Sequence, residues 1–386
     1  MTKEIDIAVI GGGIAGLSAA IAIAKAGFKP QVFEAAPVLA PLGTSLSLWP
    51  NAMACLADWG VDLPVRESGQ KISALSWRRP NGRPYFVHDL SALYREAGQT
   101  GVCIRRSDLH DHLLMSIDPA IVHLGEQLTA ISTTAQGVKL TFENGNDVHA
   151  RHVVAADGAW SKVRDHVFGD GPPKYAGYGA WLGLSSAAAP EHLSNEGCEY
   201  IGSNGRFGVF ETGKDTRYWF FVANNPTPTP HARPAKPDEV LNHLSGWPTV
   251  FADIVSGSHT DAIVYTSFHD RPIAGSWGNG PITLIGDAMH PFVPNLGQGA
   301  CQAIEDAWFL GAGFKKGLRG DPLNDWMKRN RDSRLHYMRK TAQKVGRLAQ
   351  SRNPFVRASL GVMGFGPMQK VMRADLSRQF TRDKVT

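Results

Sequence analysis

The chain has 386 residues, of which 43% are hydrophobic and 19% charged, a composition typical of a globular protein rather than a disordered one. This length favours two packed domains, and no uncharged apolar run approaches the roughly 18 residues that span a bilayer. The four cysteines are widely spaced without a CxxC or CxxH pair, which argues against a zinc site and a disulfide framework. With a strand expected almost at the N-terminus, we expect no signal peptide and a cytoplasmic protein.

The net charge of +5 is unevenly distributed. From Lys315 onward the sequence has 18 Lys and Arg against 5 Asp. Such a surplus can attract phosphates, nucleic acid or an anionic membrane. The charges are interleaved with apolar residues at helical spacing, however, and no aromatic–basic module accompanies them. We therefore interpret the segment as a solvated helical face, and expect neither a nucleic-acid partner nor stable membrane insertion.

The first 34 residues predict a βαβ unit. An apolar strand over Ile5–Ile10 leads into an Ala-rich helix over Ile14–Ala26, and Gln31–Glu34 forms a second strand. The turn before the helix has the sequence GGGIAG at residues 11–16, the pattern of dinucleotide-binding proteins.

Each part of this motif has a physical role. Gly11 permits the tight turn, Gly13 lets the backbone approach a pyrophosphate, and Gly16 lets the helix pack on the strand. The helix N-terminus offers free N–H groups to phosphates, and Glu34 can accept both hydroxyls of an adenosine ribose. Because all these parts are in register, we interpret the motif as a dinucleotide site rather than a chance glycine-rich turn. It does not distinguish FAD from NAD.

Residues 51 to 155 predict a mixture of helices and hairpins. Turn sequences punctuate the segment, with Pro-Asn-Gly at 80–82 and Asn-Gly at 144–145. The expected elements are a helix over Asn51–Trp59, a hairpin of Ser73–Arg79 and Tyr85–His88, a helix over Asp108–Ile117 capped by Ser107, and strands at Ala130–Ile131, Val138–Glu143 and Val153–Ala155.

The sequence AADGAWSKVR at residues 155–164 follows the last of these strands. Taken alone, it fits a strand-to-helix turn in which Asp157 caps the helix and Gly158 adopts an unusual backbone angle.

The pattern changes after Tyr175 to alternating aromatic segments separated by Gly, Asn and Pro clusters. This pattern predicts an antiparallel sheet inserted into the nucleotide-binding fold, before the chain returns to the first domain. The expected elements are strands at Tyr178–Leu184, Arg206–Phe210 and Arg217–Val222, a Pro-rich stretch at Pro226–Pro237, a strand at Ile282–Ile285, a helix over Ala300–Phe309 and long basic helices from Pro322 to Leu348 that close the chain.

A third motif spans residues 284–300, LIGDAMHPFVPNLGQGA. A buried strand ends in Gly286-Asp287, crosses a Pro-rich loop and enters a helix. Asp287 is placed to accept hydroxyls of a ribityl chain. The N-terminus of the helix faces the loop, and its dipole suits the negative charge of a reduced flavin.

The three motifs occur in the order and spacing of the FAD-dependent aromatic hydroxylases. From Ile5 to about Phe309 the sequence resembles the para-hydroxybenzoate hydroxylase superfamily, the class A flavoprotein monooxygenases. The stretches SLWPN (47–51), YAGY (175–178) and PNLGQG (294–299) look most like salicylate, 3-hydroxybenzoate and flavin-dependent urate hydroxylases.

The resemblance implies an α/β fold. We expect a Rossmann-like FAD-binding domain of the GR2 type (1–72, 100–174 and 275–320) and an inserted, mostly antiparallel substrate-binding sheet domain (73–99 and 175–274), followed by a C-terminal helical region (321–386). It implies a monomer or homodimer.

The resemblance also implies roles by position. We expect Pro294 above the reactive flavin face, Arg106 at the phosphate–ribityl region and Asp287 at the ribityl chain. The full set expected at FAD is Gly11, Gly13, Ile14, Ala15, Gly16, Glu34, Arg106, Leu128, Asp157, Asp287, Gly297, Gln298, Gly299 and Ala300.

The co-substrate is expected to have no domain of its own. No second strand–GxGxxG–helix unit is present, and Ala35–Gly43 lacks the basic residues that some relatives carry there. The resemblance implies that NADH or NADPH docks transiently against the flavin. The reduced flavin then captures O2 as a C4a-hydroperoxide, whose distal oxygen is attacked by the ring of a small, anionic aromatic or heteroaromatic substrate.

Candidate residues for substrate chemistry are fewer. By analogy with urate hydroxylases, Arg206 faces the cavity and pairs with an anion; the alternative is a surface arginine. Alternation allows only one of Tyr218 and Trp219 to face inward, where Tyr218 either binds substrate or packs in the sheet. We expect Phe207 beside Arg206, with Trp181, Phe207 and Phe220 serving as aromatic walls or as core. His290 suggests a general base, but packing beside Pro291 is the interpretation we favour.

Two other classes share this fold: flavin reductases or dehydrogenases without oxygenation, and binding proteins with a relic nucleotide site. The intact motifs argue against the relic.

Overall fold

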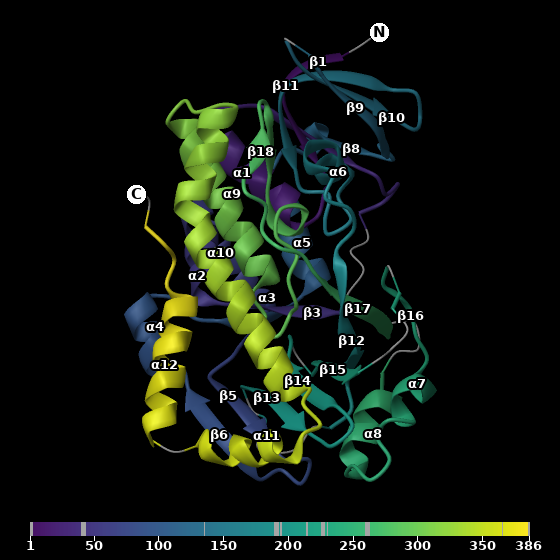
Figure 1. Cartoon of the computed structure of the whole chain (residues 1–386), viewed down its shortest axis with the longest axis vertical. Coiled ribbons are helices and arrows are strands. Elements are labelled where there is room, and N and C mark those ends of the chain that lie inside the picture. Colours follow the sequence, from purple (N-terminus) through teal and green to yellow (C-terminus); the bar gives the residue numbers. More distant parts are fainter. Residues whose placement is uncertain are drawn as a thin grey trace.

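The computed structural model describes residues 3–39, 44–134, 136–188, 193, 195–213, 215–224, 228–229, 231–258, 263–364 and 366–384. Two eight-stranded sheets, one above the other in Figure 1, organise the chain. Parts of two sequence features, Ala35–Gly43 and Pro226–Pro237, lie outside the described residues.

The first sheet is built around the βαβ unit. Its central strands are parallel in the order β19-β11-β1-β2-β8, and an antiparallel extension is attached at β11. The strands are β1 (Lys3–Ile10), β2 (Pro30–Glu34), β8 (Val122–Leu124), β9 (Leu128–Thr134), β10 (Gly137–Phe142), β11 (Asp147–Ala155), β18 (Gly278–Asn279) and β19 (Ile282–Leu284).

Helices α1 (Ile14–Lys25) and α9 (Gly299–Lys315) pack against each other beside this sheet. Apolar residues are nearly continuous in the inner strands, as expected for parallel strands covered on both faces. Further helices and a three-stranded sheet complete this half of the molecule. The helices are α2 (Pro50–Trp59), α3 (Asp62–Ser68), α4 (Ser91–Ala97), α5 (Arg106–Leu114) and α6 (Lys162–Phe168), and the strands are β3 (Ser45–Leu48), β4 (Gln70–Lys71) and β7 (Val102–Arg105).

The second sheet has the order β16-β17-β12-β15-β14-β13-β5-β6. All of its pairs are antiparallel except β13 with β5. The strands are β5 (Ala74–Arg78), β6 (Pro84–Asp89), β12 (Lys174–Ser185), β13 (Glu196–Ile201), β14 (Arg206–Glu211), β15 (Arg217–Asn224), β16 (Arg233–Pro234) and β17 (Val264–Asp270).

The two faces of this sheet have different surroundings. Trp219 and Phe221 point to one face, where they join a core with α8 (Thr249–Ser256) and residues of α7 (Pro237–Leu241). Tyr218 and Phe220 point to the other face, toward the first sheet. The alternation expected from the sequence is therefore present.

Two expectations were wrong. Ser107 does not cap the helix that follows: α5 begins at Arg106, and Ser107 Oγ bonds Asp108 instead. Nor does the basic helical stretch that ends near Leu348 close the chain. After α10 (Asp321–Ala349) the chain continues through α11 (Pro354–Ser359), η5 (Leu360–Val362) and α12 (Gly366–Phe380).

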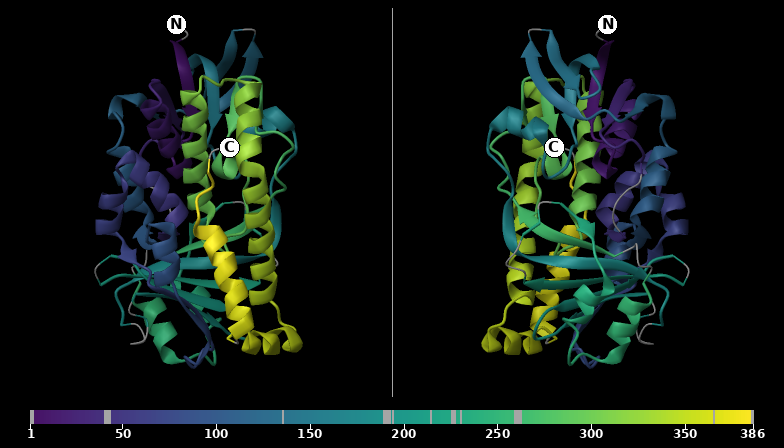
Figure 2. Two further views of the ribbon diagram at one scale, coloured as in Figure 1. Left: turned by 90° about the vertical axis from the view of Figure 1, so that its left-hand side faces the viewer. Right: turned by 90° about the vertical axis from the view of Figure 1, so that its right-hand side faces the viewer.

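The C-terminal helices connect the two halves of the molecule. α10 runs from the first sheet down past the second, and α12 turns back beside it (Figures 1 and 2). Arg339 on α10 pairs with Asp270 of β17 at 2.7 Å. Beyond α12, Arg382 donates to the carbonyl of Ala54, 328 residues earlier in the sequence. No helix in the described part of the chain is long and apolar enough to cross a membrane.

Candidate active site

A cavity of about 1150 Å³ lies between the two sheets. Most residues predicted at the site line it: Gly11, Gly13, Ile14, Ala15, Glu34, Arg106, Leu128, Asp157, Arg206, Tyr218, Asp287, Pro294, Gly297, Gly299 and Ala300. Three do not, namely Gly16, His290 and Gln298.

The glycine turn at the cavity edge is required by sterics. Gly11 has φ +103°, and a Cβ there would lie 2.5 Å from the Ala156 carbonyl oxygen. A Cβ on Gly16 would lie 1.8 Å from the Gly11 carbonyl oxygen, so Gly16 serves helix packing. Around Gly13 there is open space within 4 Å. Substitution is therefore blocked at the first two positions by the protein itself, whereas Gly13 leaves room for a ligand.

The end of β2 and the start of α1 form a polar cradle. Glu34 accepts the N–H of Gly12 at 2.6 Å and that of Ala36 at 2.9 Å, which fixes its carboxylate. No side chain caps α1 at Gly13, so its N-terminal N–H groups are available to an anion. His110 Nε2 lies 2.8 Å from the Gly12 carbonyl oxygen and ties α5 to the turn, a contact that the sequence did not predict.

Arg106 and Asp287 face the middle of the cavity from α5 and η4 (Gly286–Ala288). Burial lowers the pKa of Arg106, which the charge of Asp287 opposes. Burial raises the pKa of Asp287, while His290 and Arg106 act in the opposite direction. Among the described residues, Arg106 Nε has no hydrogen-bond partner. This guanidinium can therefore bind a phosphate.

Asp157 shows the local role that its sequence suggested. Its carboxylate accepts Ser161 Oγ at 2.5 Å and the Val163 N–H at 3.2 Å, and Gly158 has φ +81°. Ser161 in turn caps α6 by accepting the Arg164 N–H. Burial raises the pKa of Asp157. A contact with the cofactor stays a prediction.

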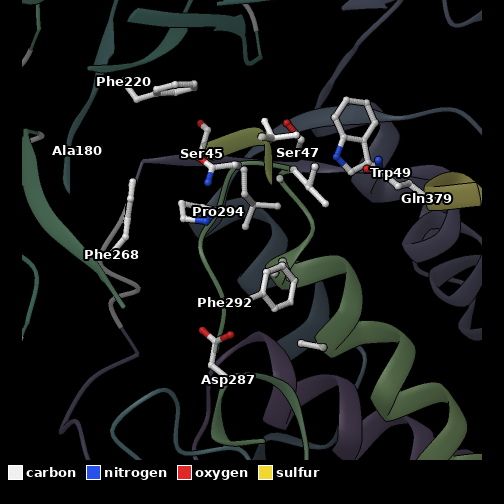
Figure 3. Close-up of a pocket in the computed structure, with 18 of the residues that line it drawn as sticks. Ser45, Ser47, Trp49, Ala180, Phe220, Phe268, Asp287, Phe292, Pro294 and Gln379 are labelled. Atoms are coloured by element: carbon white, nitrogen blue, oxygen red, sulfur yellow. The ribbon is translucent and has the colours of Figure 1, made fainter. Parts of the chain in front are cut away.

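The loop after β19 leads to a second uncapped helix N-terminus. Gly297 has φ +61°, and no side chain caps α9 at Gln298. The Gln298 side chain turns away from the cavity and accepts Asn51 Nδ2 at 3.1 Å, so only its backbone is left for the predicted role. Figure 3 shows Pro294 on this loop, with Asp287 farther along the cavity.

His290 lies behind the loop and does not line the cavity. It is 1% exposed, and its Nε2 lies 2.5 Å from Asp306 Oδ2 on α9. The same carboxylate accepts the Gly286 N–H at 2.9 Å. The catalytic candidacy of His290 therefore lacks geometric support, because the histidine fastens the loop to α9.

The wall opposite Pro294 belongs to the second sheet. Arg206 is 2% exposed, so the surface alternative was wrong. Its Nη1 lies 3.0 Å from Glu199 Oε2, and its Nη2 donates to Asn295 Oδ1 at 2.9 Å. Its guanidinium also lies 5.9 Å from the Phe220 ring centre. Burial raises the pKa of Glu199, which Arg206 opposes.

Two placements on this wall differ from expectation. Phe207 does not adjoin Arg206 in the cavity but stacks with Trp219 on the other face, with centroids 5.8 Å apart. The aromatic wall consists of Phe220, one of the residues expected as wall or core, and of Phe268; both lie across from Pro294 in Figure 3. Glu199 was not identified from the sequence, where it is one of two acids in the segment EGCEYI. Only the pairing of β13 with β14 brings it next to Arg206.

These features fit FAD. Two uncapped helix N-termini suit a pyrophosphate and the anionic edge of a reduced flavin, and Glu34 is fixed where a ribose would be bound. Asp287 and the available Arg106 lie between them. The polar groups left free on the protein match the charged groups of that dinucleotide.

Comparisons with known proteins agree. The FAD binding domain family matches residues 4–345. The chain is 32% identical over 316 residues to aurachin C monooxygenase/isomerase of Stigmatella aurantiaca, with 80% of each chain covered. It is 34% identical to 3-amino-4-hydroxybenzoate 2-monooxygenase PtnB3 of Streptomyces platensis, covering 80% of this chain and 79% of the relative.

A solved structure shows the same fold. Klebsiella pneumoniae HpxO complexed with FAD and uric acid has a TM-score of 0.87 at 24% identity, covering 97% of this chain and 96% of the other. With the family match over most of the chain, these findings establish that the protein belongs to the FAD binding domain family and is a flavoprotein monooxygenase.

Proposed function

We propose that this protein uses NAD(P)H and O2 to hydroxylate a small aromatic or heteroaromatic ring held between Pro294 and the second sheet. The observation that carries the proposal is the wall of Arg206, Tyr218 and Phe220 facing Pro294 across one cavity. Relatives named for an aminohydroxybenzoate and an aurachin support a ring substrate. When bound and reduced, FAD would activate O2 so that one of its oxygen atoms can be transferred to the ring.

The protein's own residues position the ring. Phe220 and Phe268 offer flat apolar surfaces, and together with Pro294 they restrict water near the reacting atoms. Burial raises the pKa of Tyr218, so its hydroxyl stays protonated at neutral pH and can donate a hydrogen bond to a ring oxygen.

Glu199 changes the expected substrate charge. An anionic substrate was expected because a guanidinium beside flat apolar walls suits a planar anion, but the carboxylate of Glu199 beside Arg206 balances its charge. The pair instead presents the N–H donors of Arg206 next to the carboxylate acceptor of Glu199. It suits a ring that carries an acceptor beside a donor, such as a lactam or an aminophenol.

The test is substrate-stimulated oxidation of NADH and NADPH by purified holoenzyme, with mass spectrometry for a product heavier by one oxygen atom. We expect such a product from at least one member of a panel of aromatic acids, phenols and lactams. Oxidation of NAD(P)H that yields only hydrogen peroxide with every compound would instead identify a flavin reductase.

A further inference from the structure

The cavity continues beyond the proposed ring site at Pro294 into a second region, here called the apolar lobe. It lies between the β5–β6 hairpin on one side and α10 and α12 on the other. Trp77, Phe86, Val345, Met363, Met372 and Leu376 line it. The polar groups that fit FAD and the residues proposed to hold the ring line other parts of the same cavity.

The apolar lobe reaches the surface at an apolar rim. Val362, Met368 and Val371 line the cavity, yet they are 49%, 41% and 63% exposed. Side chains that belong to both the wall and the surface mark the place where the cavity opens. A mouth used by a polar solute or by water has no need of this composition, because exposed apolar side chains gain nothing from water.

Polar side chains bordering the lobe are partly occupied. Asp375 accepts the hydroxyl of Tyr337 and the Gln379 amide at 2.7 Å. Ser76 donates to Glu196, which also pairs with Arg78. These bonds leave less polar surface for a ligand, while three methionines provide an apolar lining that adapts to chains of different shape.

We propose that the substrate ring carries an apolar chain, of alkyl or isoprenoid type, which lies in the apolar lobe and ends at the rim. The inference rests on the proposed function, because the ring must sit at Pro294 for its chain to extend between β5–β6 and α12. Continuity of the lobe with the ring site, in one cavity, is what assigns the lobe to the substrate.

The experiment uses holoenzyme and n-alkyl 4-hydroxybenzoate esters from methyl to decyl. The dissociation constant is measured from the change in the flavin spectrum, and oxygenation is followed separately by mass spectrometry. Burial of each methylene lowers the dissociation constant about fourfold, until the chain passes the rim and the effect levels off. A dissociation constant that does not change with chain length overturns the inference.

Two variants and a matched control locate the effect. Met372→Trp fills the lobe, and Val371→Asp adds a charge at the exposed rim. In both variants we expect the dissociation constant of the decyl ester to rise tenfold or more above the wild-type value, so that the constant depends less on chain length. Phe355→Asp is the control, since Phe355 is 84% exposed on α11 and does not line the cavity. If Met372→Trp does not fold, Val371→Asp still tests the rim.

The possible failures are distinguishable. Equal losses in Val371→Asp and Phe355→Asp would mean that a general apolar surface attracts the esters, and would overturn the lobe as the binding place. Oxygenation of the methyl ester without chain-length dependence would preserve the proposed function alone. Chain-length-dependent binding without oxygenation of any ester would retain the lobe and count against hydroxylation.

Discussion

Glu34 is held by two backbone N–H groups at the position where a ribose would bind. Glu34→Ala removes a charged acceptor, and a hydrogen bond to a charged group contributes roughly 1.5–3 kcal/mol. We therefore expect the dissociation constant for FAD to rise about tenfold or more in a fluorescence titration. Glu34→Gln, which keeps the shape, should be intermediate, and the exposed Glu4→Ala should have no effect. An unchanged constant in Glu34→Ala would remove Glu34 from the cofactor site.

Arg206 and Glu199 balance each other's charge, so a change of one residue affects the other. Arg206→Ala leaves the buried carboxylate unpaired, so we expect a higher KM or loss of coupling between NAD(P)H oxidation and product, with FAD content unchanged. Arg206→Lys should rescue only partly, because an ammonium lacks the planar fork. The double variant with Glu199→Gln should recover part of the loss. Equal KM and coupling in Arg206→Ala and the wild type would contradict a role in substrate binding.

Helices α9 and α10 are joined by a buried ionic network. Arg331 is fully buried and pairs with Glu305 at 2.5 Å and Asp306 at 2.7 Å, while Arg334 pairs with Glu305 at 2.8 Å. Much of the basic surplus of α10 is solvated, as the sequence suggested, but these two arginines are not.

Removal of one member of this network should therefore be costly. Arg331→Met removes the guanidinium that pairs with both buried carboxylates, leaving Arg334 at Glu305 and His290 at Asp306, and we expect the free energy of unfolding to fall by about 3–5 kcal/mol. Arg329→Met on the exposed face of α10 is the matched control. Denaturant titration of both proteins gives the measurement, and similar midpoints would show that the network contributes little.

Strand β11 carries a histidine that stays neutral in the fold. Burial, with a smaller effect of Arg319, lowers the pKa of His152 from 6.5 to about 3. Below pH 6.5 the unfolded chain takes up a proton at His152, whereas the folded chain does not. The contribution of His152 to the free energy of unfolding is therefore complete above pH 6.5 and is lost as the pH falls toward 3. From pH 7 to pH 5 the loss is roughly 2 kcal/mol. His152→Gln should lose correspondingly less stability over that range in denaturant titrations; identical pH dependence would show that His152 does not contribute.

At the scale of the whole molecule, features fixed by neighbours in sequence were predictable. The glycine turn, Glu34 and the Asp287 loop each depend on a few adjacent residues, and the structure places them along one cavity. Alternation predicted that Tyr218 or Trp219 faces inward. It could not say which, because α8 covers one face of the sheet from a distant part of the chain.

Features fixed by distant partners were missed. The role of Glu199 depends on its contact with Arg206, and the role of His290 depends on its contact with Asp306. A C-terminal helical region was expected, but the individual helices after α10 were not placed, since residues such as Phe355 and Val371 are apolar without being buried and give no clear helical stripe.

The absence of a second dinucleotide motif in the sequence leads to a kinetic prediction. We expect NAD(P)H to reach the flavin through the same cavity, and we therefore expect bound substrate to accelerate flavin reduction and limit wasteful release of peroxide. Stopped-flow reduction with and without a turnover substrate measures this. Equal rates for every turnover substrate would exclude such gating.

The contacts made at the end of α12 and just beyond it also have a consequence for folding during synthesis of the chain. Phe380 stacks on Trp49, a cavity residue, with centroids 4.9 Å apart, and Arg382 is bonded to α2. A nascent chain can form the βαβ unit early, but this side of the cofactor chamber stays open until Phe380 has left the ribosome. We therefore expect flavin loading in the cell to be completed late in translation or after it. A ribosome stalled before Phe380 would hold a chain that exchanges FAD freely with the surrounding pool.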